Sequence, residues 1–205
     1  MVAYFKSGGV YMWPLLGCLI IGAAYVIERL ISYTLSKVDI KGFMSGLKTT
    51  IKKDGVDKGI DYCKSHRSPV ARIIEAGLVA YKKVGPQKDA LEEAISNAGI
   101  TELAFLERGL PILAAVSTVA PIIGFLGTVS GMIHAFQAVA IAGEVEATLV
   151  ASGISEALVT TAVGLSIAFP VVAFHVYFTT QSNAYTRMTE SAATELITFL
   201  VEEKP

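Results

Sequence analysis

One carboxylate stands out as the residue with the most capacity for chemistry, because the sequence around it is almost free of charge. Glu156 is followed by a run, residues 157–186, that contains no Asp, Glu, Lys or Arg. At the edge of an apolar run, a carboxyl lies either at the water interface or inside a helix bundle or aqueous lumen. In the second case, desolvation and repulsion between neighbouring copies both favour its neutral form. Such a group can take part in a proton path.

Small residues form a stripe at helical spacing in each of the two long apolar runs, and Glu156 and Thr160 lie to one side of the second stripe. In the run at residues 109–143, bulky residues take the opposite face of the helix. One side therefore allows close approach of another helix, and the other side meets lipid or a further helix. These stripes predict two closely packed helices, an arrangement that by itself requires no further function. Their members are Ser117, Ala120, Pro121, Gly124, Gly127, Thr128, Gly131, Ala135 and Ala138, and then Ala157, Thr161, Gly164 and Ala168.

Three runs without charged residues predict three transmembrane helices: residues 7–27, 109–143 and 157–186. The chain is 53% hydrophobic and 17% charged, whereas a soluble domain has roughly 45–50% apolar and about 25% charged residues. A bilayer core of about 30 Å needs roughly 20 helical residues. The second and third runs exceed this length and should extend beyond the membrane. We expect an all-α membrane protein with a helical cytoplasmic domain.

The distribution of charge predicts the orientation. The segment between the first and second runs holds most of the basic residues, whereas the connection between the second and third runs holds Glu144 and Glu146 and no base. Arg29 and Arg108 lie near the membrane ends, where basic residues mark the cytoplasmic side. The N-terminus should therefore be periplasmic and the C-terminus cytoplasmic. We expect the first run to remain as a membrane helix, because a cleaved signal peptide carries its positive charge in front.

Apolar residues recur every three to four positions in the cytoplasmic segment, which predicts amphipathic helices and no strands. Ser68-Pro69 is typical of an N-cap followed by proline at the first helical position, and Gly85-Pro86 of a helix end and a new start. From Pro86 the helical spacing continues directly into the second apolar run. We predict a periplasmic N-terminus (1–9), TM1 (10–27), a cytoplasmic domain (28–110), TM2 (111–141), a periplasmic loop (142–153), TM3 (154–180) and a cytoplasmic C-terminal helix (181–205).

Other reactive side chains give weaker signals. Ser130 and His175 would be the candidates for an intramembrane Ser-His hydrolase, but this chemistry also needs an oxyanion hole and a water-filled cavity. His134 and His175 lack the spacing of metal ligands and are expected to make helix–helix hydrogen bonds or water contacts. Cys18 and Cys63 fall in different environments, so we expect no disulfide. We expect no catalytic residue, metal or cofactor, and no nucleic-acid partner, because no basic patch is interleaved with aromatic residues.

Two long motifs resemble the signatures of a known family. APIIGFLGTVSGMI at 120–133 is similar to the second-helix signature of the MotA/TolQ/ExbB proton-channel family, and GISEALVTTAVGL at 153–165 resembles its other signature. Glu28-Arg29 after the first run is similar to the family as well. Three spans with a short outer loop resemble the ExbB/TolQ branch and not the four-helix flagellar stator. One departure is Phe174-His175, where the family pattern has Tyr-Asn.

The resemblance implies a homopentameric ring in the bacterial inner membrane, driven by the proton-motive force. Its second and third helices would line a lumen that holds an ExbD/TolR-like single-span subunit, whose aspartate carries the ion, and the work would pass to a TonB/TolA-like transducer. By motif position, Thr128, Glu156, Thr161 and Thr160 would be the polar residues of the ion pathway, and the threonines suit a proton or a sodium ion. The same motifs give a helix-packing and pore stripe of Pro121, Gly124, Gly127, Gly131, Gly164 and Pro170.

A non-conducting membrane scaffold is the main alternative of a different class. Such a scaffold would explain the packing stripes equally well, since small residues are the usual contacts between membrane helices. It leaves Glu156 without a task. A ring that retains a single-span partner favours the motor, and a stable ring without partner or conductance favours the scaffold.

Overall fold

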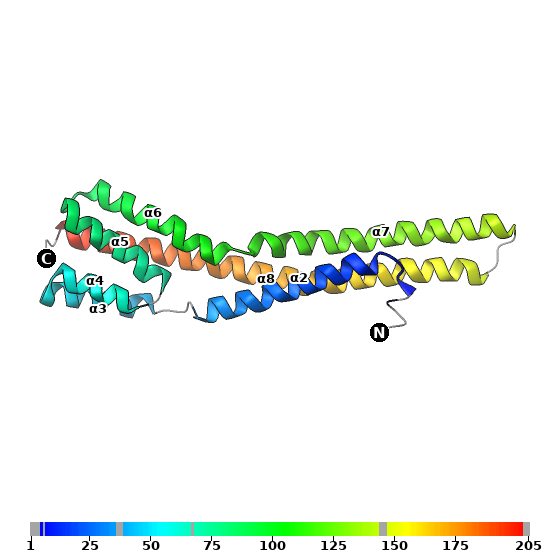
Figure 1. Ribbon diagram of the computed structural model, residues 1–205, viewed down its shortest axis with the longest axis horizontal. Helices are drawn as coiled ribbons and strands as arrows, with labels where there is room; N and C mark the ends of the chain where they lie inside the picture. Colours follow the sequence, from blue (N-terminus) through cyan, green and yellow to red (C-terminus); the bar gives the residue numbers. More distant parts are fainter. Residues whose placement is uncertain (1–4, 6, 36–38, 67, 144–146, 203–205) are drawn as a thin grey trace. The chain divides into compact units, whose positions relative to one another are not determined.

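The computed structural model describes the chain except for residues 1–4, 6, 36–38, 67, 144–146 and 203–205 (Figure 1). No strand occurs in the described part, as the helical spacing predicts. The helices are α2 (Met12–Leu35), α3 (Ile40–Asp54), α4 (Val56–Ser65), α5 (Pro69–Val84), α6 (Lys88–Glu107), α7 (Leu110–Ala142) and α8 (Ala147–Glu202).

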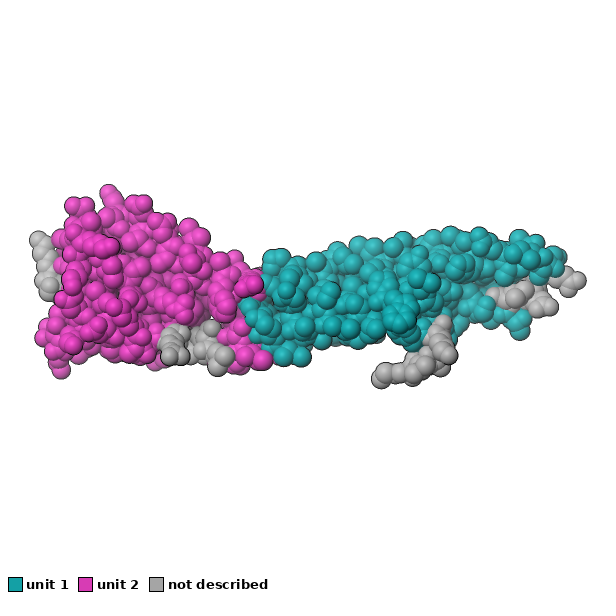
Figure 2. Space-filling model, viewed as in Figure 1, with its two compact units in different colours: residues 1–29, 109–178 teal, residues 30–108, 179–205 magenta. Residues whose placement is uncertain are grey.

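The helices form two compact units, shown in teal and magenta in Figure 2. The first, here called the apolar unit, comprises residues 1–29 and 109–178, and the second, the amphipathic unit, comprises residues 30–108 and 179–205. Helices α2 and α8 contribute to both units. The two units have different sequence patterns: charge-free runs in the apolar unit, and apolar residues at every third or fourth position in the amphipathic unit.

In the apolar unit, α2 packs beside α7 and α8. Met12 and Leu15 of α2 are buried in a cluster that also contains Ala120 of α7 and Ile167 of α8. Nearer the end of α2, a Cβ atom built on Gly22 would lie 3.0 Å from Val171 and 3.3 Å from Val116. The order of these contacts shows that α2 runs parallel to α8 and antiparallel to α7.

Helices α2, α7 and α8 are long and apolar enough to cross a membrane, as the three charge-free runs predict. Large apolar side chains also cover their outer faces: Phe125, Phe136 and Phe169 are 65%, 67% and 80% exposed. Exposure on this scale is unfavourable in water and neutral in lipid or against another protein surface. The apolar unit therefore requires a membrane or neighbouring subunits.

The sequence predicts that one helix continues from the cytoplasmic segment into the second membrane span. This prediction is wrong, because α6 ends at Glu107 and α7 begins at Leu110. Gly109 has a φ of 91°, a left-handed conformation that breaks the helix and that residues with a side chain rarely adopt. Space also requires glycine here, since a Cβ atom would lie 2.8 Å from the Tyr25 ring. Pro111 then occupies the first turn of α7, where its missing N–H has no helical partner to lose.

Other helix boundaries also differ from the expected ones. Helix α2 continues to Leu35, so Glu28 and Arg29 lie within it and not after it. Arg29 is 1% exposed, and its guanidinium pairs with the Glu28 carboxylate at 2.5 Å. Helix α8 is continuous from Ala147 to Glu202, without the expected division near residue 180, and it begins seven residues before the predicted start of the third span at residue 154.

In the amphipathic unit, α3, α4, α5, α6 and the end of α8 enclose one hydrophobic core. As predicted, Ser68 caps α5: its backbone is extended, and its hydroxyl oxygen accepts a hydrogen bond from the Ala71 N–H at 3.2 Å. Gly85 ends the same helix at a φ of 75°. The core residues include Phe43, Leu47, Ile51, Ile60, Ile74, Leu78, Leu91, Leu196, Phe199 and Leu200.

Cys63 belongs to this core and is 1% exposed. Burial raises the pKa of its thiol from 9.0 to about 12, and the negative charge of Glu75 acts in the same direction. The thiol is therefore protonated at neutral pH and behaves as a small apolar side chain. Both cysteines are free, in agreement with the expected absence of a disulfide.

Candidate ion-path site

The predicted small-residue stripes of α7 and α8 face each other within one chain. A Cβ atom built on Gly131 would lie 2.7 Å from the Gly153 carbonyl oxygen, and one built on Gly164 would lie 2.7 Å from the Ala120 carbonyl oxygen. At Gly124 the same test gives 3.0 Å to the Thr160 carbonyl oxygen. These are approaches to backbone atoms, which cannot rotate away as a side chain can. The glycines therefore permit a close antiparallel contact between the two helices.

Pro121 and Pro170 both lie inside helices, in α7 and α8 respectively. A proline inside a helix has no N–H for the carbonyl four residues earlier, which here belongs to Ser117 in α7 and Ser166 in α8. Pro121 is partly exposed and Pro170 exposed.

The three threonines take different places around this contact. Thr161 donates its hydroxyl to the Gly124 carbonyl oxygen at 3.3 Å and so links α8 to α7. Thr160 is completely buried against Gly127, and its hydroxyl bonds to carbonyl oxygens of its own helix. Thr128 is partly exposed and donates to the Phe125 carbonyl oxygen at 2.6 Å. Thr160 thus lies in the packed stripe itself and not to one side of it.

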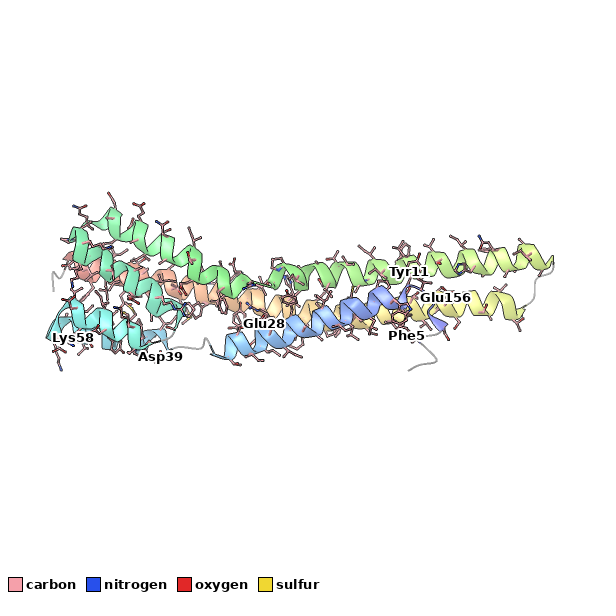
Figure 3. The ribbon with its side chains drawn as sticks, in the orientation of Figure 1. Phe5, Tyr11, Glu28, Asp39, Lys58 and Glu156 are labelled. Carbon is pink, nitrogen blue, oxygen red and sulfur yellow. The ribbon has the colours of Figure 1, made fainter. Side chains whose placement is uncertain are left out.

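Glu156 lies next to two groups that come from other parts of the apolar unit. Figure 3 labels Glu156 on α8, together with Phe5 and Tyr11 of the N-terminal segment. Its carboxylate Oε2 is 3.5 Å from Nδ1 of His134 on α7. On another side, the turn that opens α2 approaches so closely that a Cβ atom on Gly9 would overlap Glu156 Oε1. The Glu156 side chain is 19% exposed and that of His134 59% exposed. The carboxylate is thus enclosed by helix α7 and the N-terminal turn.

Within one chain, the structure does not bring Glu156 together with Thr161. Five residues separate them, which places their side chains roughly 140° apart around α8 and roughly 7.5 Å apart along it. Val159, which packs with the α2 residues Met12 and Leu15, is roughly 160° from Thr161 around the same helix. Thr161 therefore faces away from α2, whereas Glu156 contacts the turn at its start.

Thr128 has a corresponding place on α7. Ile123 packs in the cluster that contains Met12 and Leu15 of α2, and five helical residues place Thr128 roughly 140° from Ile123. Both Thr128 and Thr161 therefore lie on the side of the α7–α8 pair that α2 leaves uncovered.

The structure does not assemble the Ser-His pair considered from the sequence. Gly131, which follows Ser130, lies against Gly153 and Ala157. From Ala157 to His175 helix α8 rises roughly 27 Å, so the hydroxyl and the imidazole lie far apart. Among the described residues, no group of three or more His, Cys, Asp or Glu side chains could hold a metal ion.

Comparison with known proteins gives the class of this molecule. The sequence profile of the MotA/TolQ/ExbB proton channel family matches residues 65–191. The Tol-Pal system protein TolQ of Pseudomonas aeruginosa is 29% identical over 199 residues, which cover 83% of this chain and 84% of that relative. The biopolymer transport protein ExbB of Neisseria meningitidis serogroup B is 25% identical over 216 residues, or 98% of this chain and 96% of that relative.

A third relative matches only part of its own length. An ExbB homolog of Methanothermobacter thermautotrophicus is 29% identical over 178 residues, and this match covers 85% of the present chain but only 61% of that relative. The chain thus spans less than two thirds of that relative's length.

Three apolar helices and a glycine-mediated contact between two of them are the features of a membrane protein, and the family match gives its transport and channel class. The chain belongs to the MotA/TolQ/ExbB proton channel family, and its named relatives place it in the ExbB/TolQ branch.

Proposed function

We propose that this chain is the ring-forming subunit of an inner-membrane motor of the ExbB/TolQ type, driven by the proton-motive force. Five copies form a ring, with the N-terminus periplasmic and the C-terminus cytoplasmic. Helices α7 and α8 line a central lumen around the single-span helices of an ExbD/TolR-like subunit. Movement within the ring passes to a TonB/TolA-like transducer, for outer-membrane transport or envelope maintenance.

The observation that carries this proposal is the isolation of Glu156. From Gly109 to Thr186, the other charged residues are Glu144 and Glu146, which lie between the two apolar runs. A carboxyl in such a segment is costly unless it faces a polar path or a partner. Its ionisable neighbour is the His134 imidazole, and the segment from 109 to 186 contains no Lys or Arg that would form a salt-bridge network with it.

The uncovered side of the α7–α8 pair supports a lumen lined by Thr128 and Thr161. Helix α2 packs on the other side of the pair, as expected for a helix at the outside of a ring. The exposed Phe125 and Phe136 on α7 provide apolar surface for neighbouring subunits or lipid. Glu156 lies toward the periplasmic end of the proposed path, against the turn that opens α2. It is roughly one and a half helical turns from Thr161 along α8 and roughly 140° from it around the helix. We assign the buried Thr160 to helix packing.

The ion-carrying aspartate must come from a second protein in this scheme, since the apolar runs of this chain contain no Asp. Protonation of the partner's carboxyl removes its charge and allows it to move relative to the ring, and release on the cytoplasmic side resets it. Each charge that crosses 100 mV releases about 2.3 kcal/mol. A few protons per step therefore suffice for mechanical work on a periplasmic protein.

The test combines Glu156→Gln and Thr161→Val in a growth assay that depends on the coupled transport. We expect each substitution to reduce coupled growth, because one removes the titratable carboxyl and the other removes the hydroxyl that bridges α8 and α7. Thr118→Val is a matched control: Thr118 is exposed and bonds to the Ala114 carbonyl of its own helix. It should leave growth unchanged.

Purification of the same variants separates a motor from a scaffold. The motor requires a pentamer that retains a single-span partner, measured by native mass spectrometry in lipid nanodiscs. Full growth of both Glu156→Gln and Thr161→Val, or a stable ring without partner and conductance, would contradict the proposed function.

A further inference from the structure

The turn that opens α2 packs against α8 within the apolar unit. The rings of Phe5 and Trp13 meet edge to face with centroids 5.3 Å apart. The Met12 N–H donates to the Gly9 carbonyl oxygen at 3.4 Å, and Met12 itself is 5% exposed. Gly8 adds a contact to α8, since a Cβ atom there would lie 3.3 Å from Val159 Cγ1. The turn is therefore fixed on the helix that carries Glu156.

Gly9 combines two features that together require glycine. Its φ is 63°, a left-handed conformation that residues with a side chain adopt only at a cost. Its Cα hydrogen also points at the Glu156 carboxylate, where a methyl group would overlap Oε1. The first feature fixes the turn, and the second lets the turn close over the carboxylate.

His134 reaches the same carboxylate from α7, at 3.5 Å from Oε2. Among the described residues, it is the ionisable side chain that pairs with Glu156. The other oxygen faces Gly9, so the two neighbours contact different atoms of one carboxylate. The start of a helix also carries the positive end of its dipole, which attracts a carboxylate.

We propose that the Gly8–Gly9 turn and the imidazole of His134 are positioning groups for Glu156, which together close the ion path around its carboxylate at the outer end. This inference rests on the proposed role of Glu156 in the ion path. Helix α2 is then more than an anchor in the membrane, because its first turn sets the direction of the Glu156 side chain. His134 fixes the same side chain from the opposite helix.

The test uses the full chain with its partner subunit in native membranes, and coupled transport is measured for Gly9→Ala, His134→Leu and His134→Gln. Gly9→Ala and His134→Leu should each lower transport by about tenfold or more, since a displacement of roughly 1 Å can cost on the order of a hundredfold. His134→Gln keeps a hydrogen-bond donor and should retain most of the activity. The combination of Gly9→Ala with Glu156→Asp should restore transport relative to Gly9→Ala alone, because the shorter side chain leaves room for the methyl group.

Gly143→Ala is the matched control for backbone strain. Gly143 also has a positive φ, of 70°, but no atom lies within 4 Å of a Cβ built there. Transport in this variant should stay within about twofold of wild type, as for surface substitutions elsewhere. A cysteine pair, Gly8→Cys with Val159→Cys in a background lacking Cys18 and Cys63, should form a disulfide within one chain.

The outcomes separate this inference from the proposed function. If Glu156→Gln abolishes transport while Gly9→Ala and His134→Leu are normal, the positioning role is wrong and the ion-path role of Glu156 stands. If Glu156→Gln is itself fully active, both fail. A third outcome would also overturn the positioning role. In this case Gly9→Ala loses transport, the protein is present in the membrane at a normal level, and the added Glu156→Asp does not restore transport.

Discussion

The two units of this molecule achieve close packing by opposite means. In the apolar unit, α7 and α8 meet through glycines whose Cα atoms face backbone carbonyls, as at Gly131 and Gly164. In the amphipathic unit, five helical segments bury large side chains such as Phe43, Leu78 and Leu196. The first contact depends on the absence of side chains and the second on their volume.

This difference follows from the surroundings that each sequence requires. In water, the burial of apolar area supplies roughly 25 cal/mol per Å², so large side chains stabilise a core. Lipid is as apolar as leucine, so membrane helices associate through van der Waals contact and hydrogen bonds at short distance. The Thr161 hydroxyl can reach the Gly124 carbonyl because no side chain at Gly124 stands between them. Removal of volume should therefore damage one unit, and addition of volume the other.

The largest loss of stability is expected for Leu78→Ala in the amphipathic unit. Leu78 is fully buried, and truncation of a buried leucine typically costs about 2–5 kcal/mol, partly through the cavity that remains. Hydrogen exchange measured by mass spectrometry should show faster exchange in α5 and in the helices packed on it. Ile100→Ala is the control, since Ile100 is 70% exposed on α6. Equal exchange in the two variants would contradict a core of this kind.

Gly164→Ala and Gly99→Ala make the same chemical change in the two units, and we expect opposite effects on stability. At Gly164 the new methyl group would lie 2.7 Å from the Ala120 carbonyl oxygen and 3.1 Å from Gly124 Cα, and overpacking typically costs about 1–3 kcal/mol. At Gly99 in α6 nothing lies within 4 Å, so alanine should stabilise the helix by about 0.5–1 kcal/mol. The apparent melting temperature of the protein in lipid nanodiscs measures both.

The directions of the two changes in melting temperature test the difference in packing between the units. A rise in melting temperature for both variants would mean that α7 and α8 can separate slightly at no cost, and the close contact would lose its importance. A fall for both would mean that Gly99 has a contact in the assembled ring.

Much of the fold could be predicted from the sequence, because charge-free runs and helical spacing are local signals. The three apolar helices and the capped start of α5 at Ser68 follow from such signals. The break at Gly109 has no signal in the apolar periodicity, because the leucines on either side of it, Leu106 and Leu110, keep helical spacing across it. Pro111, two residues later, was the available clue. The early start of α8 at Ala147 lies in a segment whose composition gives no helix boundary.

The arrangement around Glu156 could be predicted only in part. Its isolation and the facing small stripes are visible in the sequence, but its neighbours are not. His134 lies 22 positions earlier on another helix, and Gly9 precedes α2. No local spacing connects these residues, because tertiary packing brings them together. Thr160 was placed beside the stripe for a similar reason, since its burial depends on the position of Gly127 opposite it.

A small and local loss of stability is expected for Ser68→Ala at the start of α5, which tests whether the amphipathic unit also depends on single polar contacts. Ser68 is 2% exposed, and its hydroxyl oxygen accepts the Ala71 N–H. Loss of an N-cap typically costs about 1 kcal/mol, so the first turn of α5 should exchange its amide hydrogens faster while the rest of the unit is unchanged.

Ser65→Ala is the control, because the Ser65 hydroxyl is exposed and donates to the Tyr62 carbonyl of its own helix. Threonine at position 68 keeps the cap and should restore protection, since a hydroxyl oxygen remains in reach of the Ala71 N–H. If Ser68→Ala instead accelerated exchange beyond α5, in the helices packed on it, as Leu78→Ala should, this cap would have a role beyond the local helix, and the contrast between the two units would need revision.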